Sequence, residues 1–168
     1  MKTYVIKIYP DPVLTLKAEN VETFDDDLKE IINNMRLTMQ VAGGVGLAAP
    51  QVGISKRIAI ISHENREYIL INPELVEYSG NDTKEEGCLS FPKIFAQVTR
   101  SYSIKVKTND VNGEIKFIEA EDYLARAFLH EMDHLDGKLF IDHISALKRG
   151  MIRKKMKKKA LETQNERK

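Results

Sequence analysis

The chain is poor in cysteine and has no long apolar run, and each absence excludes a class of protein. It contains one cysteine, Cys88, in 168 residues, so no disulfide can form within the chain. No stretch is long and apolar enough for a membrane-spanning helix, and the N-terminus has no small-residue cleavage site after its short apolar run. We therefore expect a cytoplasmic protein without a signal peptide, whose single thiol is a candidate metal ligand or nucleophile.

An internal repeat and a dividing linker are also lacking, so the sequence favours one globular unit. With 42% hydrophobic and 30% charged residues, 168 residues are enough for a sizeable core. Helical periodicity is expected over 26–41 and 121–136, and the stretch 42–53, rich in glycine, is expected to be a loop. Strand-like runs lie at 57–62, 68–75, 94–100, 103–108 and 114–120, with a hairpin turn at Asn112-Gly113. This order predicts an α+β fold with antiparallel sheets.

The charge of the chain is unevenly distributed. The net charge is +1, but residues 147–168 carry ten Lys or Arg and two Glu, a net of +8, and residues 1–146 carry a net of −7. The basic segment could attract a polyanion such as RNA, or it could be the solvated face of a C-terminal helix. One side of that helix is expected to pack on the body, because apolar residues recur there at roughly helical spacing: Leu147, Met151, Met156 and Ala160.

The most informative motif is HEMDH at residues 130–134. His130 and His134 are four residues apart on a predicted helix, so both project from one face and can bind one metal ion. Glu131 follows the first histidine, where a carboxylate can act as a base toward water. Two histidines buried in a core are the alternative, but the paired spacing with Glu131 favours a metal site. His63 and His143 lack such neighbours and are expected to be ordinary surface or loop residues.

The motif needs a third ligand. Zinc proteases that extend it to HExxHxxGxxH place a histidine where this chain has Phe140, which cannot bind a metal. Other zinc proteases use a downstream glutamate as the third ligand, but here Glu162 and Glu166 lie in the basic tail, a poor setting for a buried ligand. Cys88, in EGCLS, remains, and with the two histidines it would leave a fourth position open, as in catalytic sites.

The glycine-rich stretch admits two interpretations. Residues 44–49, GVGLAA, formally fit a dinucleotide-binding fingerprint, but that fingerprint must follow a strand and open a helix, whereas here a predicted helix precedes it. Close approach of the backbone to a ligand is the better use of these glycines. Gln51 adds a side-chain amide, a donor suited to a developing oxyanion.

Three of these segments together resemble one family. GVGLAAPQ at 44–51, EGCLS at 86–90 and HEMDH at 130–134 are similar in order and interval to the signature motifs of peptide deformylases. DPVL at 11–14 and INPEL at 71–75 extend the likeness over most of the chain, and the helical tail is similar to that of one bacterial type. The resemblance implies a catalytic domain over residues 1–147, a basic helical extension of the same domain over 148–168, and antiparallel sheets around a central HExxH helix.

The resemblance also implies a role for each matching residue. Cys88, His130 and His134 would bind one divalent metal ion, with Fe²⁺ expected in the cell and Zn²⁺, Ni²⁺ or Co²⁺ as alternatives. Glu131 would be the general acid and base. Gln51 and the backbone N–H of Leu89 would bind the formyl oxygen. The backbone of the glycine-rich loop would pair with the substrate as an added strand, through Gly44, Val45 and Gly46.

The activity implied is removal of the formyl group from N-formylmethionyl nascent peptides, with ribosomal RNA as a partner of the basic tail. Two departures from the family stand out: Leu129 replaces a frequent Gln, and Arg126 is more polar than the residue often found near the methionine pocket. Val45, Leu124 and Ala127 are candidates for that pocket. A zinc endopeptidase and a binding module without catalysis are the alternative functions.

Overall fold

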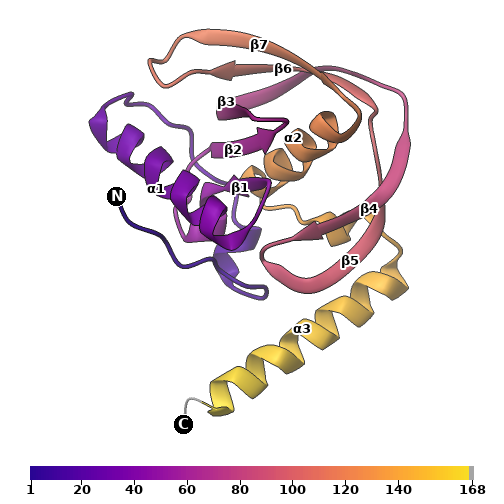
Figure 1. The fold of residues 1–168 in the computed structure, drawn as a ribbon. Coiled ribbons are helices and arrows are strands. Elements are labelled where there is room, and N and C mark those ends of the chain that lie inside the picture. Colours follow the sequence, from indigo (N-terminus) through magenta and orange to yellow (C-terminus); the bar gives the residue numbers. More distant parts are fainter. Residues whose placement is uncertain (167–168) are drawn as a thin grey trace.

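The computed structural model describes residues 1–166, which form two antiparallel sheets with helices on both sides of the larger one (Figure 1). The larger sheet has the strand order β1-β2-β3-β6-β7. Its strands are β1 (Gly46–Ala48), β2 (Ile58–His63), β3 (Arg66–Ser79), β6 (Ser103–Asn109) and β7 (Ile115–Glu121). The smaller sheet pairs β4 (Asp82–Cys88) with β5 (Phe91–Arg100). The predicted α+β class and antiparallel pairing are confirmed.

Three α-helices lie within the described residues: α1 (Asp26–Ala42), α2 (Asp122–Leu135) and α3 (Ala146–Glu166). The chain also contains three short 3₁₀ segments: η1 (Pro12–Thr15) before α1, η2 (Ala49–Val52) between β1 and β2, and η3 (Phe140–His143) between α2 and α3. The side chain of Asp25 caps α1 by accepting the N–H of Leu28 at 3.0 Å, and Gly43 ends the helix with φ 71°. Both predicted helices are therefore confirmed.

Alternation along β2 explains the two layers that cover the sheet. Ile58 and Ile60 pack in the cluster under α1, whereas Ala59 and Ile61 pack in the cluster around α2. All four are buried, as expected for a strand covered on both faces. Helix α2 consequently lies in the interior, between the large sheet and the β4–β5 hairpin (Figure 1).

Two parts of the predicted strand pattern are wrong. The stretch 42–53 is more than a loop, because it contains β1 and η2. Strand β1 is only three residues long and its pairing with β2 defines it, so no local pattern marks it. Strand β4 was not predicted, because most of its side chains are polar, and it lies in a two-stranded sheet without an apolar alternation.

The C-terminal helix is confirmed, but its predicted packing is largely wrong. Met156 is buried against η3 and β5, whereas Leu147 is 76% and Met151 64% exposed, and Ala160 is exposed as well. The helix therefore contacts the body along a narrow line (Figure 1). Within residues 1–166, no helix has both the length and the apolar character needed to cross a membrane.

Gly137 allows the chain to pass close to η1 after α2 ends. Its φ is 72°, and a Cβ added there would lie 2.6 Å from the carbonyl oxygen of Thr15. We expect Gly137→Ala to lower the free energy of unfolding by about 2 kcal/mol or more, because the left-handed conformation and a backbone clash both oppose the methyl group. Urea unfolding measures the change.

Gly150→Ala is the matched control. Gly150 lies inside α3 and an added Cβ meets nothing within 4 Å, so this change should leave stability equal or raise it by about 0.5–1 kcal/mol. Equal unfolding midpoints for the two variants would contradict the clash at Gly137.

Candidate active site

The fold brings the three predicted ligands together. His130 and His134 lie one turn apart on α2, and Cys88 is the last residue of β4. Ligand atoms of these three residues all lie within 4.8 Å of one another, and Cys88 Sγ is 3.4 Å from His134 Nε2. Both histidines are buried. This arrangement, predicted from the sequence, can hold one metal ion with two nitrogens and one sulfur.

Glu86 orients the first histidine. Its carboxylate oxygen Oε1 lies 2.8 Å from His130 Nδ1. Burial raises the pKa of Glu86, but hydrogen bonds from Arg100 and His130 outweigh burial and hold that pKa far below its usual value. Because an ionised carboxylate only accepts, His130 Nδ1 must donate, which leaves Nε2 for a metal.

Two arginines hold Glu86 in turn. Arg100 donates through Nε to Oε2 at 2.8 Å and through Nη2 to Oε1 at 2.9 Å, and Arg126 Nη1 donates to Oε2 at 2.6 Å. Arg126 also donates to the carbonyl oxygens of Val98 and Asp82. The polar character of Arg126 is thereby explained: its guanidinium joins α2 to the β4–β5 hairpin.

Sequence reasoning did not find this set of buried charges. Arg100 also donates to Asp133 at 2.6 Å, and His143 Nε2 lies 2.7 Å from the same carboxylate oxygen. His143 is exposed, as expected, but its contact with Asp133 makes it part of this network, which the sequence did not indicate. The one available signal was that Glu86 lies within the EGCLS segment.

The site fits a divalent cation. Burial and the neighbouring His130 lower the pKa of His134 to about 3, so its ring is neutral, the form that binds metals. Burial also disfavours a charged His130, but Glu131, Cys88 and Glu86 outweigh it and raise that pKa well above its usual value. The groups around His130 thus favour a positive charge beside its ring, whether a proton or a metal ion. A ligand set of one sulfur and two imidazoles suits zinc, iron(II), cobalt or nickel.

Glu131 is buried beside the ligands. Burial raises its pKa to about 7, with His130 opposing the shift and Glu86 adding to it. Its atom Oε1 is buried and has no hydrogen-bond partner within residues 1–166, and the rest of its carboxylate packs against Gly46 of β1. A carboxyl group with a pKa near neutrality can both accept and return a proton.

Gly46 provides the room for that carboxylate. A Cβ at position 46 would overlap Glu131 Oε2 and lie 3.0 Å from its Cδ. We expect Gly46→Ala to displace Glu131 and to lower catalytic turnover about 100-fold, because misplacement by about 1 Å can cost this much. Metal content should be unchanged. Turnover within twofold of wild type would show that Glu131 does not need this space.

The side chain of Gln51 is oriented by the backbone of Ala48, three residues earlier. Its Oε1 accepts the N–H of Ala48 at 2.9 Å, so Nε2 must point the other way, to Ser90 Oγ at 3.2 Å and Cys88 Sγ at 3.5 Å. This donor is buried beside the ligand atoms. Leu89 follows Cys88 directly, and its side chain covers Gly44, so the two walls of the site meet here.

A cleft of about 590 Å³ lies between the glycine-rich loop and the β4–β5 hairpin, and the site residues that line it include Gln51, Cys88, Leu89, His130 and Glu131. Of the residues predicted for a methionine pocket, Val45 and Ala127 line it. Leu124 does not, because it packs against the core around α2, and Tyr123 lines the cleft instead. Phe140, at the position of a protease's third histidine, is buried with its ring 5.1 Å from that of Phe91.

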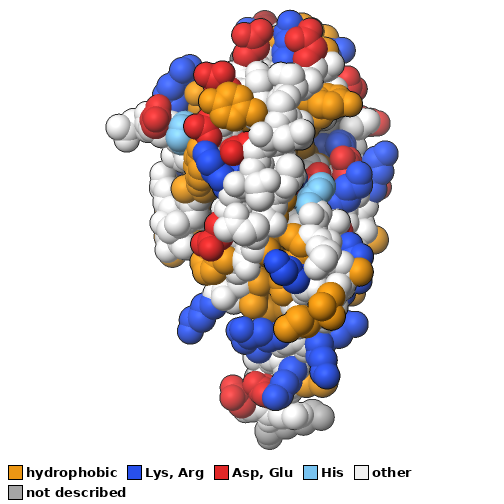
Figure 2. Space-filling model, turned by 90° about the vertical axis from the view of Figure 1, so that its right-hand side faces the viewer, with side chains coloured by type: hydrophobic (Ala, Val, Ile, Leu, Met, Phe, Trp, Pro, Cys, Tyr) orange, Lys and Arg blue, Asp and Glu red, His pale blue; other side chains and the backbone are white. Residues whose placement is uncertain are grey.

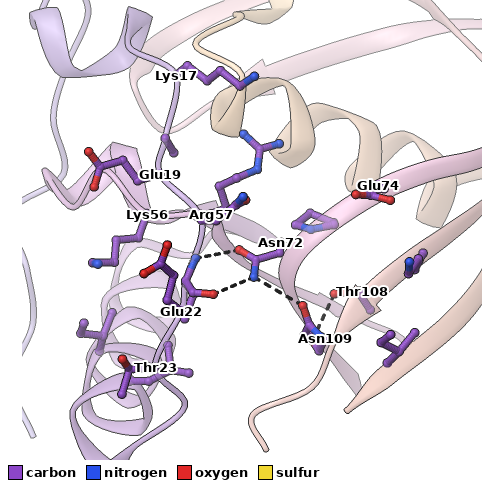
Figure 3. A pocket seen from close by; sticks show the side chains of 18 of the residues that line it. Lys17, Glu19, Glu22, Thr23, Lys56, Arg57, Asn72, Glu74, Thr108 and Asn109 are labelled. Carbon is purple, nitrogen blue, oxygen red and sulfur yellow. Dashed lines mark hydrogen bonds between the residues drawn. The ribbon is translucent and has the colours of Figure 1, made fainter. Parts of the chain in front are cut away.

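A larger cleft of about 1240 Å³ lies between α1 and the strands β3 and β6 (Figure 3). Asn72 exchanges two hydrogen bonds with the backbone of Val21, at 2.8 and 2.9 Å. Arg57 donates to the carbonyl of Leu135 and to Asp136. Asn72 and Arg57, the central polar residues of this larger cleft, are thus hydrogen-bonded within the protein and hold neighbouring segments together. None of the candidate ligands lines this cleft, so we do not assign the active site to it.

Comparison with known proteins agrees with this geometry. The family model described as "Polypeptide deformylase" matches residues 3–150. A peptide deformylase of Thermotoga maritima is 49% identical, covering 91% of this chain and 94% of that protein. The crystal structure of a peptide deformylase from Legionella pneumophila superposes with a TM-score of 0.89 at 42% identity, over 96% of this chain and 98% of that one.

A structure from Ehrlichia chaffeensis, solved in complex with actinonin, has a TM-score of 0.90 at 37% identity, over 95% of this chain and 98% of that one. The sequence resemblance is thus confirmed, and the protease alternative is not favoured. The residues that converge on Cys88, His130 and His134 lie within the matched range, and this chain belongs to the polypeptide deformylase family.

Proposed function

We propose that this protein is a metal-dependent hydrolase that removes the formyl group from N-formylmethionyl peptides and releases formate. The observation that carries the proposal is the convergence of Cys88, His130 and His134 beside a buried Glu131 whose pKa is about 7. The family of the chain supports the same reaction. Nascent chains carry this group where they are made, so the proposal implies a cytoplasmic enzyme.

Cys88, His130 and His134 would hold the metal ion. Bound there, the ion supplies Lewis-acid polarisation of an oxygen and lowers the pKa of water toward about 7. We infer iron(II) for the cell, with zinc, nickel and cobalt able to occupy the same donors. Metal analysis after anaerobic purification, paired with turnover, tests this choice.

The protein's own residues then divide the reaction. Glu131 accepts a proton from the attacking water and returns it to the leaving α-amine. Gln51 Nε2 and the N–H of Leu89 would donate to the formyl oxygen as charge develops on it. The backbone of Gly44, Val45 and Gly46 would hold the peptide as an added strand.

Turnover of formyl-Met-Ala-Ser is the direct test. Formate should appear in proportion to free N-terminal methionine, with one metal ion per chain. Cleavage of unformylated peptides would instead support a zinc endopeptidase. Absence of any turnover by the metal-loaded protein would support a binding module without catalysis.

We also propose that α3 docks on ribosomal RNA. Lys and Arg side chains gather around α3 at the lower end of the molecule (Figure 2). In α3, Met156 is the buried residue, and of the basic side chains Arg149 and Arg153 contact Asp142. Four lysines of this helix are exposed and can meet a polyanion: Lys154, Lys155, Lys157 and Lys158. Co-sedimentation with ribosomes should weaken with salt and after removal of residues 148–168. Binding indifferent to both would identify α3 as solvated surface.

A further inference from the structure

One wall of the active-site cleft carries a large exposed aromatic ring. Phe95, on β5, lines the cleft and is 63% exposed. The preceding residue Ile94 and the strand's first residue Phe91 are buried in the core between β5, η3 and α3. Phe91 and Ile94 also line the cleft, but they do so from this core, so Phe95 is the exposed ring on this wall.

The local backbone holds the ring in this place. Gly87 pairs with Phe95, but the next residue, Cys88, pairs with Phe91, so residues 92–94 form a bulge in which Lys93 has φ 62°. Bulges beside active sites redirect side chains. A Cβ on Gly87 would lie 2.7 Å from Phe95 Cε1, so the ring rests on the backbone of Gly87, one residue before a metal ligand.

The glycine-rich loop also presents an apolar side chain to the cleft. Val45, in the glycine-rich loop, lines the cleft and is 48% exposed. The floor of the cleft differs, because Ala127 and Glu131 of α2 are buried. Phe95 and Val45 therefore lie at the mouth, where a peptide whose first residue occupies the floor must leave.

The charged side chains of the cleft do not favour one charge on the substrate. Lys93 and Glu85 both line the cleft and carry opposite charges. Successive residues of an extended peptide are about 3.3 Å apart, so the two residues after the first pass the mouth. Apolar contact with an exposed ring is then a side-chain interaction available to them, and Phe95, at 63%, is more exposed than Tyr123, the other exposed aromatic residue of the cleft, at 44%.

We propose that Phe95 is a specificity-determining residue, which with Val45 selects an apolar side chain at one of the two positions after formylmethionine. This inference rests on the proposed deformylase activity. Contact with the substrate would bury a ring that the folded protein leaves in water, and this gain is available only to peptides with an apolar side chain there.

Two peptide series test the proposal, formyl-Met-Xaa-Ala and formyl-Met-Ala-Xaa, with Phe, Leu, Ser or Asp as Xaa. With the metal-loaded wild type, kcat/KM for Phe or Leu should exceed that for Ser about 10-fold at one position. Phe95→Ser should reduce this ratio to about twofold or less, and Phe95→Leu should retain most of it. Phe117→Ser is the matched control, because Phe117 is 58% exposed on β7 and does not line the cleft.

A variant that gains a new substrate preference provides a second readout, which cannot be explained by a general loss of activity. Phe95→Glu should favour Lys over Asp several-fold at the same position, because a carboxylate then faces that side chain. An unchanged ratio in Phe95→Ser, or no apolar preference in the wild type at either position, would overturn the proposal while deformylation stands. Loss of the preference for formyl-Met over formyl-Ala in Phe95→Ser would also overturn it, by assigning the ring to the methionine pocket. No formate from any peptide with the wild type would instead contradict the proposed function itself.

Discussion

Glu131→Gln should lower formate release by about 10²–10⁴-fold, the usual range for loss of a general acid–base group. The amide has nearly the same shape as the carboxyl group but cannot take up a proton. It would lie in the same buried space against Gly46, so packing should change little. The expected result is therefore a fall in kcat with the protein folded and one metal ion per chain. Formate release at saturating formyl-Met-Ala-Ser measures the change.

Glu119→Gln is the control for the same chemical change, because Glu119 is exposed on β7 outside the cleft. It should retain wild-type turnover. Near-full activity of Glu131→Gln would show that Glu131 does not carry the proton in this reaction. A loss of metal in that variant would instead show that the carboxylate holds the ion.

Cys88→Ala should remove the metal. Of the three proposed ligands, Cys88 would supply the sole sulfur and, with the metal bound, the sole negative charge, so we expect metal affinity to fall by more than about 100-fold. Metal content per chain, measured after dialysis against a weak chelator, should drop from one to near zero. Turnover should fall with it.

Glu86→Gln gives a graded comparison. Glu86 is not one of the three candidate ligands, but it accepts a hydrogen bond from His130 Nδ1 at 2.8 Å. Losing such a partner of a ligand typically lowers metal affinity by about 10–100-fold. The expected order of metal retention is wild type, then Glu86→Gln, then Cys88→Ala. If Cys88→Ala keeps one ion per chain, the third ligand is another residue.

Short-range patterns explain why much of the fold was predictable. Helix α1 has an apolar side, an Asp25 cap and a Gly43 end, all readable within twenty residues. The β6–β7 hairpin has a turn at Asn112-Gly113 between alternating strands, and it was predicted correctly. Strands β1 and β4 were not predicted, because one is defined by its pairing with β2 and the other is polar on both faces.

The sequence by itself determined the chemistry of this protein, and the tertiary structure decided how that chemistry is supported. HEMDH places two imidazoles and a carboxylate on one turn, because helical spacing is a local property. The bond between Glu86 and His130 joins residues 44 positions apart, and Arg126 holds Glu86 from a different element. The near-neutral pKa of Glu131 and the exposed ring of Phe95 likewise depend on burial and on strand register. Burial and register arise only when distant segments pack, so no local pattern encodes them.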